Sequence, residues 1–178
     1  MPDLLPIRSE RIVIRRLSSG DLPAFQAYRH DATVGRYQGW KPQPDAEARA
    51  FIQDMASTAL FSLGKWVQLG IADGQTDLLI GDLGLFVAPD GNSAAIGFTL
   101  CTQAQGRGLG TEAVGQAIQL LFQNTAVAYI EGITDARNVA SIRLLERIGM
   151  RRTATLSAVF NHEPCIEYRY AISRGACG

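Results

Sequence analysis

The hydrophobic and polar positions of this chain follow two different periods. Residues 10–17 (ERIVIRRL) are a short apolar run, rich in β-branched side chains and flanked by charged residues, which predicts a strand. Further strands are predicted in the middle and at the end of the chain, at residues 65–72, 78–87, 93–101, 126–134, 151–160 and 163–172. Short turn-rich segments join the first three of these. They cannot hold a crossover helix, so these strands should form an antiparallel meander.

Apolar residues at helical spacing predict helices between these strands. Four helices are expected, beginning at Ser18 or Ser19, beginning near Pro44–Asp45, and covering residues 110–124 and 138–149. A serine hydroxyl suits the start of the first helix, and Gly149 is well placed as the C′ residue of the last. The chain contains no repeat, linker or low-complexity segment, so residues 1–178 are expected to form one α+β domain.

Composition narrows the function classes. The 17 basic residues balance the 17 acidic ones without a basic stripe, so no nucleic-acid or anionic membrane partner is expected. Cys101, Cys165 and Cys177 are widely spaced with no CxxC pair, so no metal site or disulfide framework is expected. No apolar run approaches the ~20 residues of a membrane span, and charges interrupt the first residues where a signal peptide would be apolar. The protein is therefore expected to be cytoplasmic.

Three glycines at alternate positions, Gly106, Gly108 and Gly110, lie just before the 110–124 helix. A Walker loop is excluded because Thr111 and Glu112 follow the last glycine, where a lysine and a hydroxyl are required. A dinucleotide-binding fingerprint, G-x-G-x-x-G, would place its third glycine at position 111 or 113, where the chain has Thr111 and Ala113. It also belongs to a parallel βαβ unit, whereas this loop follows an antiparallel meander.

The spacing that remains is Q/R-x-x-G-x-G/A, beginning at Gln105. Glycines let the backbone come close to a pyrophosphate, and successive N–H groups at the start of a helix can then hold it. Arg107 would add a positive charge. A tight strand-to-helix turn with no ligand is the alternative for this loop.

With a second motif, NVASIRLLERIGM at 138–150, the sequence resembles the GNAT superfamily of acetyl-CoA-dependent N-acetyltransferases. IGFTL at 96–100 and QGRGLGTEA at 105–113 carry the rest of this likeness. SERIVIRRLSSGDL, RYQGW and LIGDLGL resemble its Rim-type branch, named for ribosomal-protein N-terminal acetyltransferases. The resemblance implies a three-layer fold, in which about four helices flank a mixed, mostly antiparallel sheet of about seven strands. It also implies that strand 96–100 diverges from strand 127–133, with the pantetheine arm of acetyl-CoA between them.

The resemblance also implies roles for individual residues. The residues implied to bind the cofactor are Leu100, Cys101, Gln105, Gly106, Arg107, Gly108, Leu109, Gly110, Thr111, Asn138, Ser141 and Arg143. The backbone N–H of Thr99 is the implied oxyanion donor, and Ser141 would hydrogen-bond the leaving thiolate. The alternatives are an N-cap role for Asn138 and solvent-exposed helix positions for Ser141 and Arg143.

Tyr37 and Trp40 lie in the loop that borders the acceptor site in the Rim branch, where they would contact the acceptor or anchor the loop as a lid. Many relatives have a general-acid tyrosine where this chain has Leu145, and a glutamate where it has Ala95. The base must therefore be another group. His162 is the speculative candidate, beside Glu163, Asp135 and His30.

These observations predict an acetyl-CoA-dependent N-acetyltransferase that transfers acetyl to a primary amine by direct attack on the thioester. The amine would be a protein or peptide N-terminus or a small molecule. A non-catalytic acyl-CoA-binding or sensing module is the alternative, and a nucleotide-dependent oxidoreductase ranks last. The sequence names neither the acceptor nor the oligomeric state, for which a homodimer is one option.

Overall fold

A computed structural model describes residues 4–176, and these contain an eight-stranded sheet in the order β1-β2-β3-β4-β5-β6-β8-β7. Its strands are β1 (Ile7–Arg8), β2 (Ile12–Arg16), β3 (Trp66–Asp73), β4 (Leu79–Val87), β5 (Ser93–Leu100), β6 (Tyr129–Asp135), β7 (Arg151–Phe160) and β8 (Glu163–Ser173). All neighbouring strands are antiparallel except β5 and β6. This sheet confirms the predicted antiparallel meander of β3, β4 and β5.

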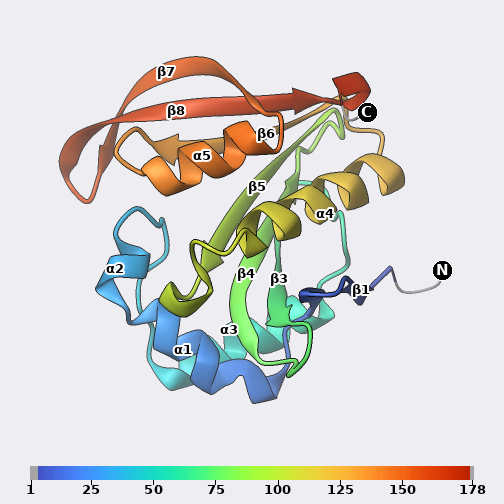
Figure 1. Cartoon of the computed structure of the whole chain (residues 1–178), viewed down its shortest axis with the longest axis vertical. Coiled ribbons are helices and arrows are strands. Elements are labelled where there is room, and N and C mark those ends of the chain that lie inside the picture. Colours follow the sequence, from blue (N-terminus) through green and yellow to red (C-terminus); the bar gives the residue numbers. More distant parts are fainter. Residues whose placement is uncertain (1–3, 177–178) are drawn as a thin grey trace.

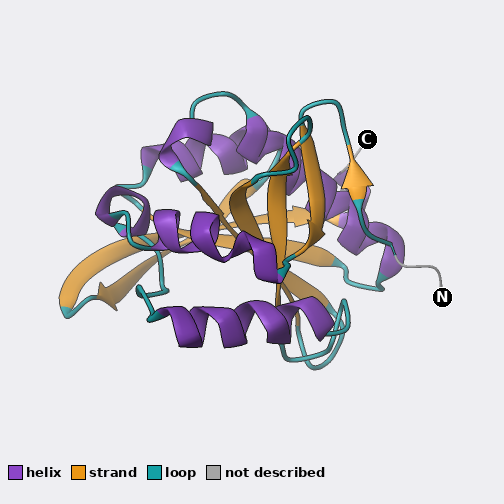
Figure 2. Cartoon of the chain, turned by 90° about the horizontal axis from the view of Figure 1, so that it is seen from below, coloured by secondary structure: helices purple, strands orange, loops and turns teal. Residues whose placement is uncertain are grey.

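Helices cover both faces of this sheet (Figures 1 and 2). They are α1 (Leu22–Arg29), α2 (Ala32–Gly35), α3 (Asp45–Ser57), α4 (Leu109–Asn124) and α5 (Val139–Arg147). Residues of α1, α2 and α3 form one hydrophobic cluster, and residues of α4 and α5 pack with most of the strands in a second, larger one. The α+β class and its three layers are thus as the resemblance implied.

The counts differ from the expected seven strands and four helices, because the described residues contain eight strands and five α-helices. Both additional elements are short: β1 has two residues and α2 has four. Segments of this length carry no period that can be recognised in a sequence. The α2 helix overlaps residues 34–44, a segment rich in glycine, proline and aromatic residues that the sequence predicts to be a loop. Asp31 caps this helix by accepting hydrogen bonds from the N–H groups of Thr33 and Val34.

The sheet divides between β5 and β6 (Figure 1). These strands pair from Ser93–Tyr129 to Ala95–Glu131. The β4–β5 ladder continues to Leu100, while the β6–β8 ladder continues to Asp135. The two halves of the sheet therefore separate beyond the third pair and leave an opening between the carboxyl-terminal parts of β5 and β6.

Asp21 forms an ion pair that joins the start of α1 to β2. Arg15 donates two hydrogen bonds to this carboxylate, at 2.8 and 2.9 Å, and Asp21 is only 5% exposed. Burial alone would raise the pKa of Asp21, but the hydrogen bonds from Arg15 and from the Ser18 backbone outweigh it and hold the pKa below 3.8.

We expect Asp21→Asn to lower the free energy of unfolding by about 2 kcal/mol at neutral pH, because a charged hydrogen-bonded pair is lost. A carboxyl with a lowered folded-state pKa stabilises the protein above its unfolded pKa, and this contribution disappears as the pH falls through the folded value. The difference in the free energy of unfolding between the wild-type protein and Asp21→Asn should therefore shrink as the pH falls below the unfolded pKa of 3.8. Urea denaturation across the acid range measures this, and a difference independent of pH would contradict it.

Candidate functional site

The glycine loop connects β5 to α4, and its glycines serve two purposes. Gly106 and Gly108 have φ values of +72° and +77°, a left-handed conformation that other residues rarely adopt. Gly110 is needed for a different reason, since a Cβ there would lie 2.8 Å from Cδ1 of Leu144 on α5. The helix starts at Leu109, so the first N–H groups of α4 lack intrahelical acceptors and form an anion-binding end.

An arginine from β1–β2 supports this loop. Arg11 donates a hydrogen bond of 3.0 Å to the backbone carbonyl of Arg107 and one of 2.8 Å to the Glu112 carboxylate in the first turn of α4. Glu112 also accepts a hydrogen bond from the Ser9 hydroxyl. Because Arg11 and Glu112 neutralise each other, the charge of Arg107 at the exposed tip remains available to an anionic ligand.

The direction of the β5 hydrogen bonds decides which backbone groups face the opening. The Cys101 N–H donates to the Ile80 carbonyl at 2.8 Å, so the backbone N–H and carbonyl groups at this position face β4. Successive residues of a strand alternate in this direction, so Thr99, which is paired with Asp82, also points toward β4. The backbone N–H and carbonyl groups of Leu100 and Phe98 face the β6 side instead. Of the residues implied to bind the pantetheine or the oxyanion, only Leu100 therefore presents its backbone to the opening.

Two glutamine side chains lie along the same edge of β5. Gln105 donates to the Leu100 carbonyl at 2.9 Å, and Gln38 donates to the Phe98 carbonyl at 3.3 Å. The N–H groups of Phe98 and Leu100 point toward the same opening, where the pairing with β6 has ended. They are therefore donors placed for a ligand between the strands.

Two of the residues predicted to bind the cofactor from the 138–149 helix, which is α5 with its N-cap, lie beside this opening. Asn138 caps α5 by accepting a hydrogen bond from the Ser141 N–H at 3.2 Å, and both side chains line a pocket of about 260 Å³ between β5 and β6. We call this the β5–β6 pocket. Leu145, where many relatives have a tyrosine, is 1% exposed and borders the same pocket. Arg143 is exposed on the outer face of the helix.

Two carboxylates, Asp135 and Glu167, line the β5–β6 pocket from adjacent strands, where they are register partners. Arg137 donates to Asp135 through Nε at 2.9 Å and Nη2 at 2.7 Å. These hydrogen bonds hold the pKa of Asp135 below its usual value, so this carboxylate is a poor proton acceptor.

His162, the speculative base, lies in the turn between β7 and β8. It is exposed and has a φ of +66°, next to Asn161 with a φ of +50°. Residues with positive φ at both central positions form the tight turns that suit β-hairpins. Phe160 lines the β5–β6 pocket, whereas His162 contributes to the turn.

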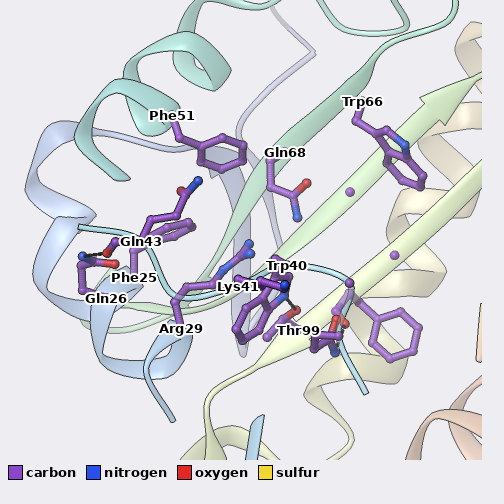
Figure 3. A pocket seen from close by; sticks show the side chains of 15 residues that line it. Phe25, Gln26, Arg29, Trp40, Lys41, Gln43, Phe51, Trp66, Gln68 and Thr99 are labelled. Atoms are coloured by element: carbon purple, nitrogen blue, oxygen red, sulfur yellow. Dashed lines mark hydrogen bonds between the residues drawn. The ribbon is translucent and has the colours of Figure 1, made fainter. Parts of the chain in front are cut away.

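Trp40 and Tyr37 border different pockets. Trp40 lines a pocket of about 490 Å³, which we call the aromatic pocket, on the sheet face covered by α1 and α3 (Figure 3). Its indole Nε1 donates to the Thr99 hydroxyl at 3.2 Å, and the Arg29 guanidinium stacks 4.4 Å from its ring centroid. Tyr37 lines the β5–β6 pocket. The two pockets share four lining residues: Gln38, Gly39, Gly97 and Phe98.

A buried charged network underlies the aromatic pocket. Asp82 on β4 is 0% exposed and accepts hydrogen bonds from the Tyr28 hydroxyl at 2.5 Å, Arg29 Nη2 at 2.8 Å and Gln68 Nε2 at 2.6 Å. Burial and the adjacent Asp82 charge raise the pKa of Tyr28 well above its usual value, so its phenol remains a hydrogen-bond donor. The network fixes Arg29, and Arg29 in turn holds the Trp40 ring.

Sequence reasoning missed several of these residues. Gln38 has no periodic pattern around it, and Arg11 meets Glu112 only through the fold. Asp82 did carry a signal: it is the only charged residue of an otherwise apolar strand, and such a carboxylate needs buried partners.

Comparison with known proteins now decides the family. A model of the acetyltransferase (GNAT) domain matches residues 11–151, which is more than half of the chain. The chain belongs to the GNAT family. This GNAT protein is accordingly an N-acetyltransferase, an enzyme that transfers acetyl groups to amines.

Individual relatives are distant in sequence. The GNAT chain is 26% identical over 152 residues to the uncharacterized N-acetyltransferase YoaA of Bacillus subtilis, covering 84% of this chain and 85% of that one. It resembles the spermidine N-acetyltransferase of Vibrio cholerae, solved with CoA and spermine, at 18% identity, a TM-score of 0.81 and coverage of 95% and 99%. It also resembles the ribosomal L7/L12 alpha-N-protein acetyltransferase RimL, solved with coenzyme A, at 15% identity, a TM-score of 0.79 and coverage of 94% and 96%. These structural likenesses support the fold.

The described residues of this GNAT enzyme contain neither a metal-binding cluster nor a membrane-spanning helix. Within residues 4–176, no cluster of three or more histidine, cysteine, aspartate or glutamate side chains is arranged to hold a metal ion. No helix in that range is both long and apolar enough to cross a membrane. Cys177 lies outside the described residues, whereas Cys101 is half-buried and packs against both hydrophobic clusters.

Proposed function

We propose that this enzyme takes its acetyl group from acetyl-CoA and transfers it to a primary amine by direct attack on the thioester. The observation that carries the proposal is the continuous path from the glycine loop, along the unpaired edge of β5, to the β5–β6 pocket. Relatives solved with CoA support the choice of donor. The motifs that resemble the Rim branch support a protein or peptide N-terminus among the acceptors, beside small amines.

The donor's binding groups follow from this path. The pyrophosphate would bind the N–H groups from Gly106 to Thr111 at the start of α4, with Arg107 adding charge. The pantetheine would bind the Leu100 backbone, which faces the opening. Asn138 would contact the donor while it caps α5.

The acetyl carbonyl would accept a hydrogen bond from the Phe98 N–H. We assign the oxyanion role to Phe98 instead of Thr99, because the Thr99 backbone points toward β4. When the amine nitrogen bonds to the carbonyl carbon, negative charge develops on the carbonyl oxygen, and a fixed donor there lowers the barrier. The carbon–sulfur bond then breaks, and the Ser141 hydroxyl, which lines the pocket, would hydrogen-bond the departing thiolate.

The attacking amine must lose a proton, and we assign its acceptance to Glu167. Its carboxylate lines the pocket and is half-buried, whereas Asp135 is held in its charged form by Arg137. His162 at the hairpin tip is the competing candidate. Water between the amine and the carboxylate can relay the proton.

Glu167→Gln is expected to lower kcat/KM at neutral pH by about 100-fold, the scale of a lost general base. Raising the pH should recover part of the loss, because more of the amine is then already neutral. Glu163→Gln, an exposed change in the neighbouring hairpin turn, is the matched control. If His162→Gln caused the loss instead, the assignment to Glu167 would be wrong.

A thiol-release assay with acetyl-CoA and a panel of amines and peptides tests the proposed function, with mass spectrometry of the acetylated product. We expect release of CoA that depends on the acceptor. Tight binding of CoA without turnover of any acceptor would contradict the proposal and favour an acyl-CoA sensor.

A further inference from the structure

The two connected pockets differ in charge. The charged side chains that line the β5–β6 pocket are both carboxylates, Asp135 and Glu167. Those that line the aromatic pocket are both cations, Arg29 and Lys41. Among the described residues, therefore, no carboxylate side chain lines the aromatic pocket, and no cationic one lines the β5–β6 pocket.

The positive character of the aromatic pocket is only partly compensated by the protein. Asp82 beneath it is matched by Arg29, and this pair leaves Lys41, an exposed side chain, without an opposing carboxylate in the lining. Arg29 is 7% exposed, and its Nε has no hydrogen-bond partner among the residues described. That N–H dipole adds to the positive potential in the pocket.

A neighbouring pocket also contains more basic than acidic side chains. A third pocket of about 360 Å³ shares Arg29 and Lys41 and adds His30 and Arg36. Its carboxylate, Asp31, accepts hydrogen bonds from the N–H groups at the start of α2 and from the Thr102 hydroxyl, and these favour its charged form. Arginine and lysine side chains therefore outnumber carboxylates in this third pocket, as they do in the aromatic pocket.

We propose that the acceptor carries a carboxylate in addition to its amine, with the amine at the β5–β6 pocket and the carboxylate on the Lys41 side. Aromatic rings line the larger pocket and suit an apolar body between the two charged groups; they belong to Phe25, Trp40, Phe51 and Trp66, which Figure 3 labels, and to Phe98. A polyamine fits poorly, because its second ammonium group would lie near Arg29 and Lys41 with no carboxylate in that lining. This inference rests on the proposed function and names the substrate class for it.

The test compares acceptors that differ only at the second charged group. The set is ω-aminohexanoate, its amide and the corresponding diamine, in which a methylene chain separates the two charged groups. A pair of tripeptides with aspartate or asparagine at the second position distinguishes an acidic peptide from a free amino acid. We expect kcat/KM for the carboxylate to exceed that for the amide by about tenfold, the diamine to be poorest, and the preference to weaken at high salt.

Lys41→Glu should reduce the ratio of kcat/KM for carboxylate over amide by about tenfold. Lys65→Glu is the matched control, because it changes the net charge equally and Lys65 lines none of the three pockets. The inference is overturned if the amide and diamine react as well as the carboxylate, or if both variants shift the ratio equally. Absence of thiol release with every acceptor would instead overturn the proposed function itself.

Discussion

Gly97→Trp is expected to abolish acetyl transfer, lowering kcat/KM by more than about 100-fold, while the protein remains folded. Gly97 lines both the β5–β6 pocket and the aromatic pocket, at the place where they meet. A Cβ at this position would have no other atom within 4 Å, so a side chain can be added there without a clash at its base. The indole must then occupy the space that the acceptor needs, which lowers turnover directly.

The melting temperature separates this effect from misfolding. Gly97 lies within β5 and has no left-handed φ, so a larger residue also lowers the entropy of the unfolded chain. Gly97→Ala, the small control, should keep most of the activity and melt at the wild-type temperature or slightly above. Gly110→Trp is the contrasting case, because a Cβ there would lie 2.8 Å from Leu144 and should destabilise the fold. An active Gly97→Trp enzyme would mean that the acceptor does not pass between the two pockets.

Asp82→Ala is expected to lower the free energy of unfolding by about 4 kcal/mol, because it leaves the buried Arg29 cation without its counter-charge. For a chain of this length, such a loss corresponds to a fall in melting temperature of about 10 °C. The Tyr28 hydroxyl and the Gln68 amide also lose their acceptor. Thermal and urea unfolding both measure the effect.

A double variant identifies the cause. Asp82→Leu combined with Arg29→Met removes both charges and fills a similar volume, so it should recover more than half of the lost stability. It also removes the cation stacked on Trp40, so KM for the acceptor should rise even where stability returns. If the double variant were no more stable than Asp82→Ala, the loss would come from packing and not from the unpaired charge.

Local sequence patterns were sufficient for most of the regular elements and for the glycine loop. The β-branched run of β2 and the helical spacing of α4 depend on neighbouring residues, and each predicted element matches the structure to within two residues at its ends. The Gly106 and Gly108 loop is equally local, since its positive φ values are a requirement of the turn itself. The likeness to the GNAT family rested on these segments and their order.

The remaining features required contacts between distant parts of the chain. Thr99 and Phe98 are neighbours in sequence, but the register of β4 against β5 decides which of their N–H groups faces the opening beside β6. The partners of Asp82 come from α1 and β3, and the charge difference between the pockets arises only when the 34–44 loop meets β5 and α1. Sequence alone thus determined most of the elements, the family and the glycine loop, because these depend on short-range backbone and hydrophobic preferences. The tertiary structure decided which N–H groups of β5 face the opening and which side chains line the two pockets, because these depend on strand register and on side chains far apart in the chain.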